Sequence, residues 1–249
     1  MTAIYDRIGI GYADLRVPDP RIARLLADAL GEGTVVNIGA GAGSYEPPRT
    51  TAAVEPSPVM LDQRPATAAP AVQAVAEALP FADGQFDAAL ASLTTHHWTD
   101  ARQGLEEMAR VSRRQVVLTW DAEYTAEHFW VLTDYLPEAG ERELDLAEMR
   151  TVLEVWPDAT AVPVLVPHDC TDGFFAAYWR RPEAYLVPAV RDAISGLALL
   201  DEQLVAEAME RLRSDLGDGS WARRHAGLLD KESHDCGYRL VIRDPCRSR

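Results

Sequence analysis

Short hydrophobic runs recur along the chain and are separated by polar turn residues. They cover residues 34–38, 52–54, 71–75, 86–91, 115–120, 161–166 and 238–242. Several of these runs lack the two-residue alternation of a strand with one exposed face, and continuous runs are typical of strands that are buried on both faces of a mostly parallel sheet. The pattern therefore predicts a sheet of seven strands.

Amphipathic helical patterns lie between these runs. Asp19 is suited to cap a helix that begins at Pro20 and ends at Gly31, with apolar residues at three- and four-residue spacing between them. Residues 100–111 carry a second pattern of this kind. Alternating strands and helices predict a doubly wound α/β fold.

The pattern changes after residue 120. Helical segments dominate there, and aromatic residues gather in segments 124–135 and 174–185. One interpretation is a helical cover over the carboxyl ends of the strands, with an aromatic lining for a substrate. The other is an ordinary helical layer whose aromatic side chains form a core, and the sequence leaves both open.

Charge and composition limit the classes of partner that the protein can bind. The 249 residues include 24 basic and 39 acidic side chains, a formal net charge of −15. Such a surface repels phosphates, so we expect no nucleic-acid partner. The sequence contains no apolar run of the roughly 20 residues that a membrane span needs.

The N-terminal segment and the cysteines suggest a cellular compartment for the protein. Asp6 and Arg7 interrupt the segment where a signal peptide would need an apolar core, so we expect a cytoplasmic protein. Cys170, Cys236 and Cys246 have neither a zinc-binding spacing nor a disulfide pattern, which suits a reducing compartment. We expect no metal site.

A glycine-rich turn follows the first predicted strand. Asn37-Ile38-Gly39-Ala40-Gly41-Ala42-Gly43 lets a ligand approach the backbone closely. Glu55 follows the second strand, 16 residues after Gly39, where a carboxylate can accept hydrogen bonds from both hydroxyls of a ribose. The combination indicates a cofactor that contains adenosine. The alternative is that Glu55 is a solvated strand end.

A third motif, Ala-Glu-Ala-Leu-Pro-Phe-Ala-Asp-Gly-Gln-Phe-Asp, occupies residues 76–87. With this motif the chain resembles the class I S-adenosylmethionine-dependent methyltransferases, in the type-11 branch of small-molecule enzymes. The resemblance is good over residues 34–120. The rest of the chain resembles the family only in the order of its predicted elements. It implies a Rossmann-like seven-stranded sheet whose last strand is antiparallel, with S-adenosyl-L-methionine as the cofactor.

The resemblance also implies roles for particular residues. The glycines would lie beneath the methionine part of the cofactor, Glu55 would bind the ribose, Ala76 and Glu77 would flank the adenine, and Arg16 would pair with the methionine carboxylate. The candidate cofactor-binding residues are Tyr12, Arg16, Asn37, Gly39, Ala40, Gly41, Gly43, Tyr45, Glu55, Pro56, Met60, Ala76, Glu77 and Leu93.

The sequence departs from the family pattern at three places. Asn37 stands where the family usually has an acid, and Val75 stands where an Asp often contacts the adenine amino group. Only eleven residues separate Gly43 from Glu55, so we expect the first crossover helix to be reduced to about one turn, with Tyr45 replacing lost contacts.

Histidines near strand ends are candidates for a catalytic base, because their pKa lies near neutrality. These are His96, His97 and His168, of which at most one acts. Adjacent residues in an extended segment point in opposite directions, so we expect only one of His96 and His97 to face the pocket. The alternative is that they pack structurally. The candidate acceptor-binding residues are Trp98, Phe129, Trp130, Tyr178 and Arg181.

The sequence thus predicts methyl transfer to a small-molecule acceptor. The alternative is a protein of the same fold that binds the cofactor without catalysis. We expect a single domain, residues 1–249, with an N-terminal cap (1–31), a cofactor-binding core (32–120), a helical substrate cover that contains the sixth strand (121–235), and the last strand and tail (236–249). The methyl acceptor, the methylated atom and the formation of a homodimer are left open.

Overall fold

A twisted sheet of seven strands organises the part of the chain that the structure describes. The computed structural model describes residues 16–146 and 148–245. The strands lie in the order β3-β2-β1-β4-β5-β7-β6, and β7 runs antiparallel to both of its neighbours. Their bounds are Val35–Ile38 (β1), Thr50–Val54 (β2), Ala71–Val72 (β3), Phe86–Ser92 (β4), Ser112–Trp120 (β5), Thr160–Pro167 (β6) and Ser233–Arg243 (β7). The predicted doubly wound, mostly parallel sheet is confirmed.

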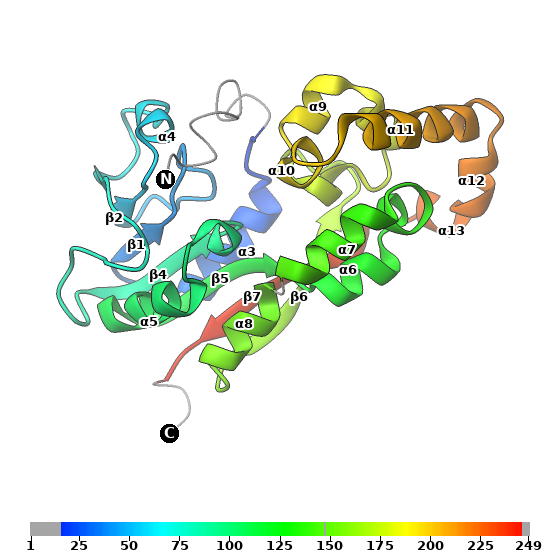
Figure 1. Cartoon of the computed structure of the whole chain (residues 1–249). Helices are drawn as coiled ribbons and strands as arrows, with labels where there is room; N and C mark the ends of the chain where they lie inside the picture. The colour runs from blue at the N-terminus through cyan, green and yellow to red at the C-terminus, as the bar shows by residue number, and fades with distance from the viewer. Residues whose placement is uncertain (1–15, 147, 246–249) are drawn as a thin grey trace.

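Helices cover both faces of this sheet and one of its ends (Figure 1). They are α3 (Pro20–Leu30), α4 (Pro58–Asp62), α5 (Ala101–Val111), α6 (Ala122–His128), α7 (Pro137–Leu146), α8 (Glu148–Val155), α9 (Pro188–Asp192), α10 (Ser195–Ala198), α11 (Glu202–Gly217), α12 (Ser220–Arg224) and α13 (Ala226–Leu229). As predicted, α3 begins after Asp19, which caps it, and ends before Gly31. No helix of the described residues is long and apolar enough to cross a membrane.

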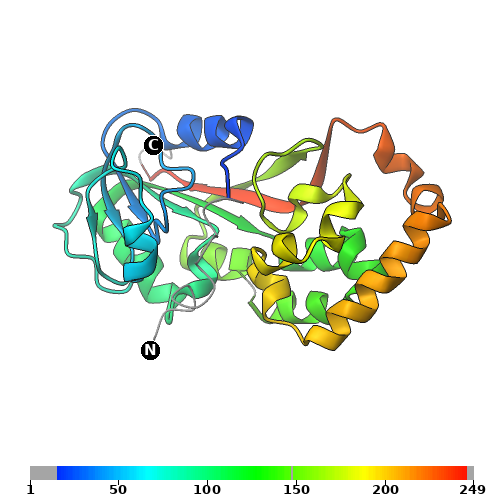
Figure 2. The same ribbon diagram turned by 90° about the horizontal axis from the view of Figure 1, so that it is seen from above.

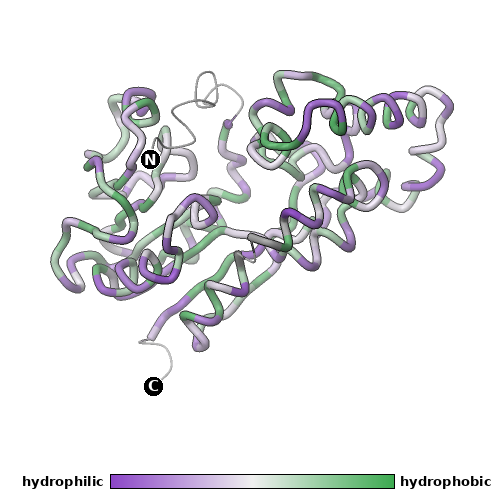
Figure 3. The backbone as a smooth tube through the Cα atoms, in the orientation of Figure 1, coloured by the Kyte–Doolittle hydropathy of each residue, from purple (hydrophilic) through white to green (hydrophobic). Residues whose placement is uncertain are grey.

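Each face of the sheet has its own hydrophobic cluster. Successive residues of a strand point to opposite faces. In β4, Ala88 and Leu90 join the cluster that contains α3 residues, whereas Ala89 and Ala91 join the one that contains α5 and α8 residues. Figure 2 shows α3 on the opposite side of the strands from α5, and Figure 3 shows hydrophobic positions along the central strands. Burial on both faces explains the continuous hydrophobic runs.

The helical cover beyond the strand ends has an aromatic core. The ring of Trp130 meets those of Tyr135, Tyr185 and Trp221 edge to face, and its indole N–H donates to the carbonyl of Trp179 at 2.8 Å. Such contacts stabilise beyond the area that they bury. Of the two interpretations left open by the sequence, a core holds for these residues.

The connection between β1 and β2 is shorter than the sequence predicts. Residues 39–49 form turns and no helix, so even the expected single helical turn is missing. With eleven residues between Gly43 and Glu55, the chain must return directly to the start of β2. Hydrogen bonds and an ion pair between polar side chains hold this connection in place.

A buried ion pair holds this connection. The side chains of Glu46 and Arg64 are each only 6% exposed, and Nη2 of Arg64 lies 2.9 Å from the Glu46 carboxylate. The same carboxylate accepts from the side-chain amide of Asn37 at 3.1 Å and from the backbone N–H of Ala69 at 2.9 Å. Arg64 also donates to the carbonyl of Gly41 at 3.4 Å. This polar cluster fastens the glycine loop to β1 and to the segment that follows α4.

Glu46→Gln should lower the free energy of unfolding by about 3 kcal/mol, because it removes the countercharge of a buried guanidinium. Denaturant unfolding followed by tryptophan fluorescence measures this change. The control is Glu210→Gln, which breaks an exposed pair with Arg213 (side chains 72% and 55% exposed) and should cost about 0.5 kcal/mol or less. Equal losses in the two variants would contradict the role of the buried pair.

The cap of α3 is a buried carboxylate. Burial acts to raise the pKa of Asp19, but hydrogen bonds from Arg21 and from the backbone of Thr171 outweigh burial and lower the pKa to about 2. A carboxylate with a lower pKa in the folded state stabilises the fold above its unfolded pKa of about 4, and this contribution is lost as the pH falls toward 2.

Asp19→Asn should therefore flatten the acid side of the stability profile. From about pH 5 to about pH 2 the unchanged protein should lose about 2 kcal/mol more than the variant, which follows from about 1.4 kcal/mol per pKa unit. Urea unfolding at a series of pH values measures this difference. Asp28→Asn, at an exposed position of the same helix, should keep the original profile. Parallel profiles for Asp19→Asn and the unchanged protein would exclude the cap as an acid-sensitive group.

Candidate active site

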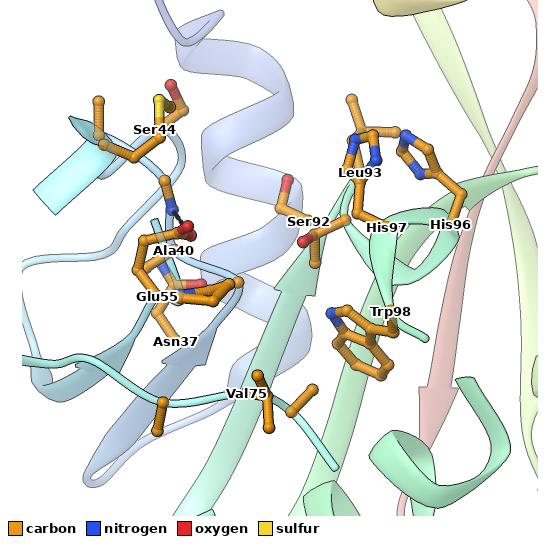
Figure 4. Close-up of a pocket in the computed structure, with 18 of the residues that line it drawn as sticks. Asn37, Ala40, Ser44, Glu55, Val75, Ser92, Leu93, His96, His97 and Trp98 are labelled. Carbon is orange, nitrogen blue, oxygen red and sulfur yellow. Dashed lines mark hydrogen bonds between the residues drawn. The ribbon is translucent and has the colours of Figure 1, made fainter. Parts of the chain in front are cut away.

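A pocket of about 420 Å³ opens at the carboxyl ends of β1, β2 and β4. This edge is where open α/β sheets bind ligands. Figure 4 shows side chains from the strand ends and the loops that follow them around this pocket. Its lining consists of Arg16, Asn37, Gly39, Ala40, Gly41, Ala42, Ser44, Tyr45, Glu55, Pro56, Met60, Ala74, Val75, Ala76, Glu77, Ser92, Leu93, Thr94, His96, His97, Trp98 and Thr99.

The structure brings together nearly all of the candidate cofactor residues that it describes. Each of them lines the pocket except Gly43, which lies at the loop turn facing Arg64. Tyr12 lies outside the described residues. The lining also includes residues that the sequence analysis did not name as site residues, among them Ser44 and Ser92. Their position next to the glycine loop and at the end of β4 is the signal that could have found them.

The glycine loop depends on two glycines. Gly39 has a φ of +66°, and a Cβ atom there would lie 2.1 Å from Oγ1 of Thr94. Gly41 has a φ of +51°, and its Cβ atom would lie 3.3 Å from the terminal methyl group of Met60. The left-handed conformation disfavours larger residues at both positions, and at Gly39 the contact with Thr94 adds a steric clash. The loop therefore leaves its backbone open to the pocket.

Glu55 connects β2 to this loop. It is buried at the strand end, where one carboxylate oxygen accepts from the backbone N–H of Gly41 at 2.8 Å and the other from that of Ser57 at 2.9 Å. The carboxylate thus fixes the loop and the start of α4 at the same time. The interpretation of Glu55 as a solvated strand end is wrong for this structure.

The opposite wall of the pocket is apolar. The side chain of Val75 is 48% exposed there, in line with the short β3, which ends before the predicted residue 75. Trp98 packs on α5, where Gly104 leaves room for its ring. Glu77 accepts from the backbone N–H of Asp100 at 3.0 Å and so ties this wall to the start of α5. A flat apolar group fits between such surfaces.

Both His96 and His97 line the pocket. Residues Thr95–His97 form a 3₁₀ turn instead of an extended segment, so the expectation that only one would face the pocket is wrong. Their ring centroids lie 3.7 Å apart. Burial lowers the pKa of His97 to about 4, and burial, together with the charges of His97 and Arg16, places the pKa of His96 well below its usual range. Both imidazoles are therefore neutral near pH 7.

Arg16 reaches the pocket as part of an ion pair. Its Nε donates to Asp172 at 2.7 Å and its Nη2 to the second carboxylate oxygen at 3.4 Å, and the Asp172 side chain is fully buried. Beside this pair, Tyr45 is buried with a φ of +60°, and its hydroxyl accepts from the backbone N–H of Asp19 at 3.3 Å. Tyr45 lines the pocket, where the sequence analysis expected it.

Other candidate residues lie away from the pocket. Phe129 and Trp130 are in the aromatic core of the cover. Arg181 donates to the carbonyls of Cys170 and Ala177 and lies over the ring of Tyr178. His168 follows β6 beside Glu232. These side chains pack the cover and its surface, and none of His168, Phe129, Trp130, Tyr178 and Arg181 lines the pocket.

A smaller pocket of about 60 Å³ adjoins the first and shares Arg16, Leu93 and His96 with it. We call it the aromatic pocket. Its remaining lining residues are Trp120, Phe174, Phe175, Ala193, Ile194, Ser195, Gly196 and Tyr238. Phe174 and Phe175 belong to the aromatic segment 174–185 that the sequence suggested as a lining, whereas Trp120 and Tyr238 were not expected there, because segments far apart in the chain form this pocket together.

Comparisons with known proteins agree with this geometry. Residues 30–119 match the model of the methyltransferase domain family. A crystal structure from Anabaena variabilis, described as a methyltransferase from an antibiotic biosynthesis pathway, is 34% identical, with a TM-score of 0.82 over 92% of this chain and 98% of that chain. No curated protein gives a significant match.

Two further solved structures are more distantly similar. A geranyl diphosphate methyltransferase in complex with GPP and sinefungin is 17% identical, with a TM-score of 0.50 over 90% of this chain and 77% of that chain. A SAM-dependent methyltransferase from Thermotoga maritima is 21% identical, with a TM-score of 0.49 over 66% of this chain and 84% of that chain. The likeness to the first of these concerns the fold alone.

The Anabaena structure decides the family, because it is more than 30% identical and this chain covers nearly all of it. The sheet order, the glycine loop and Glu55 stand where the sequence resemblance implied. The chain belongs to the class I S-adenosylmethionine-dependent methyltransferases.

Proposed function

We propose that the protein binds S-adenosylmethionine in the larger pocket and transfers its methyl group to a small-molecule acceptor. The observation that carries this proposal is the position of Glu55 and the glycine loop, side by side at the ends of neighbouring strands and bordering a pocket of about 420 Å³. When bound, S-adenosylmethionine would supply a methyl group on a positively charged sulfur.

The residues present fit this cofactor. A carboxylate offers about four acceptor positions, which lets Glu55 accept hydrogen bonds from ribose hydroxyls while it braces Gly41. The apolar surfaces of Val75 and Trp98 suit the faces of an adenine ring. The absence of a side chain at Gly39 and Gly41 gives the methionine part access to the backbone.

Asn37 supports the proposal despite its departure from the family pattern. A carboxylate can only accept hydrogen bonds, so Asn37 must turn its amide nitrogen to Glu46, at 3.1 Å. Its carbonyl oxygen then faces away from Glu46, and Asn37 lines the pocket. In this position a neutral oxygen can accept from the ammonium group of the cofactor, where the family usually offers a charged one.

The acceptor side supports a small molecule. The net charge of −15 disfavours a nucleic-acid acceptor. The relative from Anabaena is described as part of an antibiotic biosynthesis pathway, and such pathways build small molecules. Methyl transfer is a displacement that depends mainly on alignment of the reacting atoms. The neutral imidazoles of His96 and His97 line the pocket and can take up a proton from the acceptor, whereas His168 lies elsewhere.

Glu55→Gln should weaken the binding of S-adenosylhomocysteine by about 1–3 kcal/mol, because an amide cannot accept all of the hydrogen bonds that the carboxylate accepts. Isothermal titration calorimetry measures the affinity. Asp62→Asn is the matched control, because Asp62 lies exposed on α4 outside the pocket and should leave the affinity unchanged. Unchanged affinity in Glu55→Gln would contradict the cofactor assignment.

Catalysis needs its own test, because a non-catalytic binding protein of the same fold would also bind S-adenosylhomocysteine. We expect the protein to transfer labelled methyl groups from S-adenosylmethionine to at least one member of a panel of small hydroxyl and amine compounds. Tight cofactor binding without transfer to any of them would favour the non-catalytic alternative.

A further inference from the structure

We propose that the methyl acceptor binds in the aromatic pocket and that its nucleophile is the hydroxyl group of an uncharged aromatic ring. This inference rests on the proposed function of the larger pocket, because it takes the rim of Arg16, Leu93 and His96, which the two pockets share, as the meeting point of acceptor and cofactor. Three properties of the pocket support it: its walls, its charge, and two buried polar atoms for which residues 16–146 and 148–245 supply no partner.

The walls of the aromatic pocket suit a flat ring. Trp120 on β5 and Tyr238 on β7 are direct partners in the antiparallel ladder. The ring of Phe174 lies 4.6 Å from that of Tyr238, and the ring of His96 meets that of Trp120 at 4.9 Å and 72°. A further ring that entered this set could make offset or edge-to-face contacts of the same kind.

The charges around the pocket disfavour an ionised acceptor. Arg16 is the cation at the rim, and the fully buried Asp172 already binds it through two hydrogen bonds. An anionic acceptor would have to share this guanidinium with Asp172, whose negative charge already neutralises it, so Arg16 attracts a second anion less strongly. A cationic acceptor would find no carboxylate, because no acidic side chain is among the described residues that line the pocket.

Two buried polar atoms at this pocket have no hydrogen-bond partner among the described residues. They are Nδ1 of His96 and the indole Nε1 of Trp120, and Trp120 as a whole is only 8% exposed. Buried polar atoms without partners are rare and need an explanation. Both residues line the aromatic pocket, so a ligand that enters it with a shift of the lining can supply the missing partners.

The chemistry of these two atoms selects a hydroxyl group. The indole N–H only donates, whereas the neutral imidazole of His96 can accept at Nδ1 in the tautomer that carries its proton on Nε2. A hydroxyl group accepts and donates at the same time, a carboxylate only accepts, and an ammonium group only donates. Of these three groups, only a hydroxyl group can serve both atoms.

The transfer step balances with these groups. The acceptor oxygen forms the new bond to the methyl carbon with its lone pair, while the bond between that carbon and sulfur breaks and its electron pair stays on sulfur. The hydroxyl proton passes to Nδ1 of His96 and then to solvent. Because His96 borders both pockets, it can hold this proton beside the reacting oxygen.

The size of the pocket limits the acceptor. A volume of about 60 Å³ is well below the roughly 150 Å³ of a cavity that takes up benzene. A ring can enter only when part of the lining moves outward. Residues 193–196, which run from the end of α9 into α10, belong to the helical cover, as do Phe174 and Phe175. The proposal therefore favours an acceptor with one ring.

Four probes of similar size test the proposal on the full chain saturated with S-adenosylhomocysteine: phenol, toluene, benzoate and benzylamine. Ligand-observed NMR titration measures their affinities. We expect phenol to bind tighter than toluene, which lacks the hydroxyl group, and tighter than the two charged probes. Tighter binding of benzoate or benzylamine than of phenol would overturn the proposal.

A matched pair of variants locates the binding. Trp120→Phe keeps an aromatic ring but removes the N–H donor, so it should weaken phenol binding about fivefold and leave toluene binding unchanged. Trp221→Phe removes another buried indole N–H that has no partner within the described part of the chain, in the core of the cover, and should change neither affinity. Equal phenol affinity in Trp120→Phe and the unchanged protein would overturn the role of Trp120.

The failure of this inference can be told apart from failure of the proposed function. S-adenosylhomocysteine binding is measured first, and its absence would refute the proposed function. Phenol titration of the protein without S-adenosylhomocysteine then still decides the acceptor class, because the aromatic rings, Nδ1 of His96 and Nε1 of Trp120 belong to the chain itself. We expect phenol to retain its preference over benzoate and benzylamine there, and loss of that preference would overturn the inference.

Discussion

The buried ion pair between Glu46 and Arg64 holds the part of the molecule on which the larger pocket is built. The chain has eleven residues in which to return from Gly43 to Glu55, and they contain no helix. A crossover helix would bury apolar side chains against the sheet, whereas this connection relies on a carboxylate, a guanidinium and the amide of Asn37. Polar bonds of this kind have strict directions, so the cluster also fixes which atoms Asn37 turns toward the pocket.

Features with local causes could be predicted from the sequence. The cap at Asp19, the proline that follows it and the glycine at the end of α3 act within a few residues of chain, and they placed that helix correctly. The hydrophobic runs gave the strands because burial on both faces leaves few polar positions. The glycine loop and Glu55 could also be predicted, because each directly follows a strand and parallel neighbouring strands end at one edge of the sheet.

Other features of the site could not be predicted from the sequence, most of them because they depend on contacts between residues distant in the chain. His96 and His97 both reach the pocket through a local 3₁₀ turn, closed by hydrogen bonds from His97 to Thr94 and from Trp98 to Thr95, which the assumption of an extended segment missed. Phe129 and Trp130 have the same character as the residues of the aromatic pocket, but their neighbours in space bury them in the core. Trp120 and Tyr238 face one another across the β5 and β7 ladder, 118 positions apart in the chain, and hydrophobic pattern alone does not set such a register.

The place of β7 in the sheet has a consequence for how the chain folds. Strand β7 lies between β5 and β6 and is the last strand in sequence, so β6 reaches the rest of the sheet only through it. Until residues 233–243 are in place, β5 presents an open edge and β6 has no partner in the sheet. Pairing across such sequence distances is slow, and open edges invite association between unfinished chains. The pairing of β7 therefore completes the sheet, and it ends the interval in which the open edge of β5 can associate with other unfinished chains.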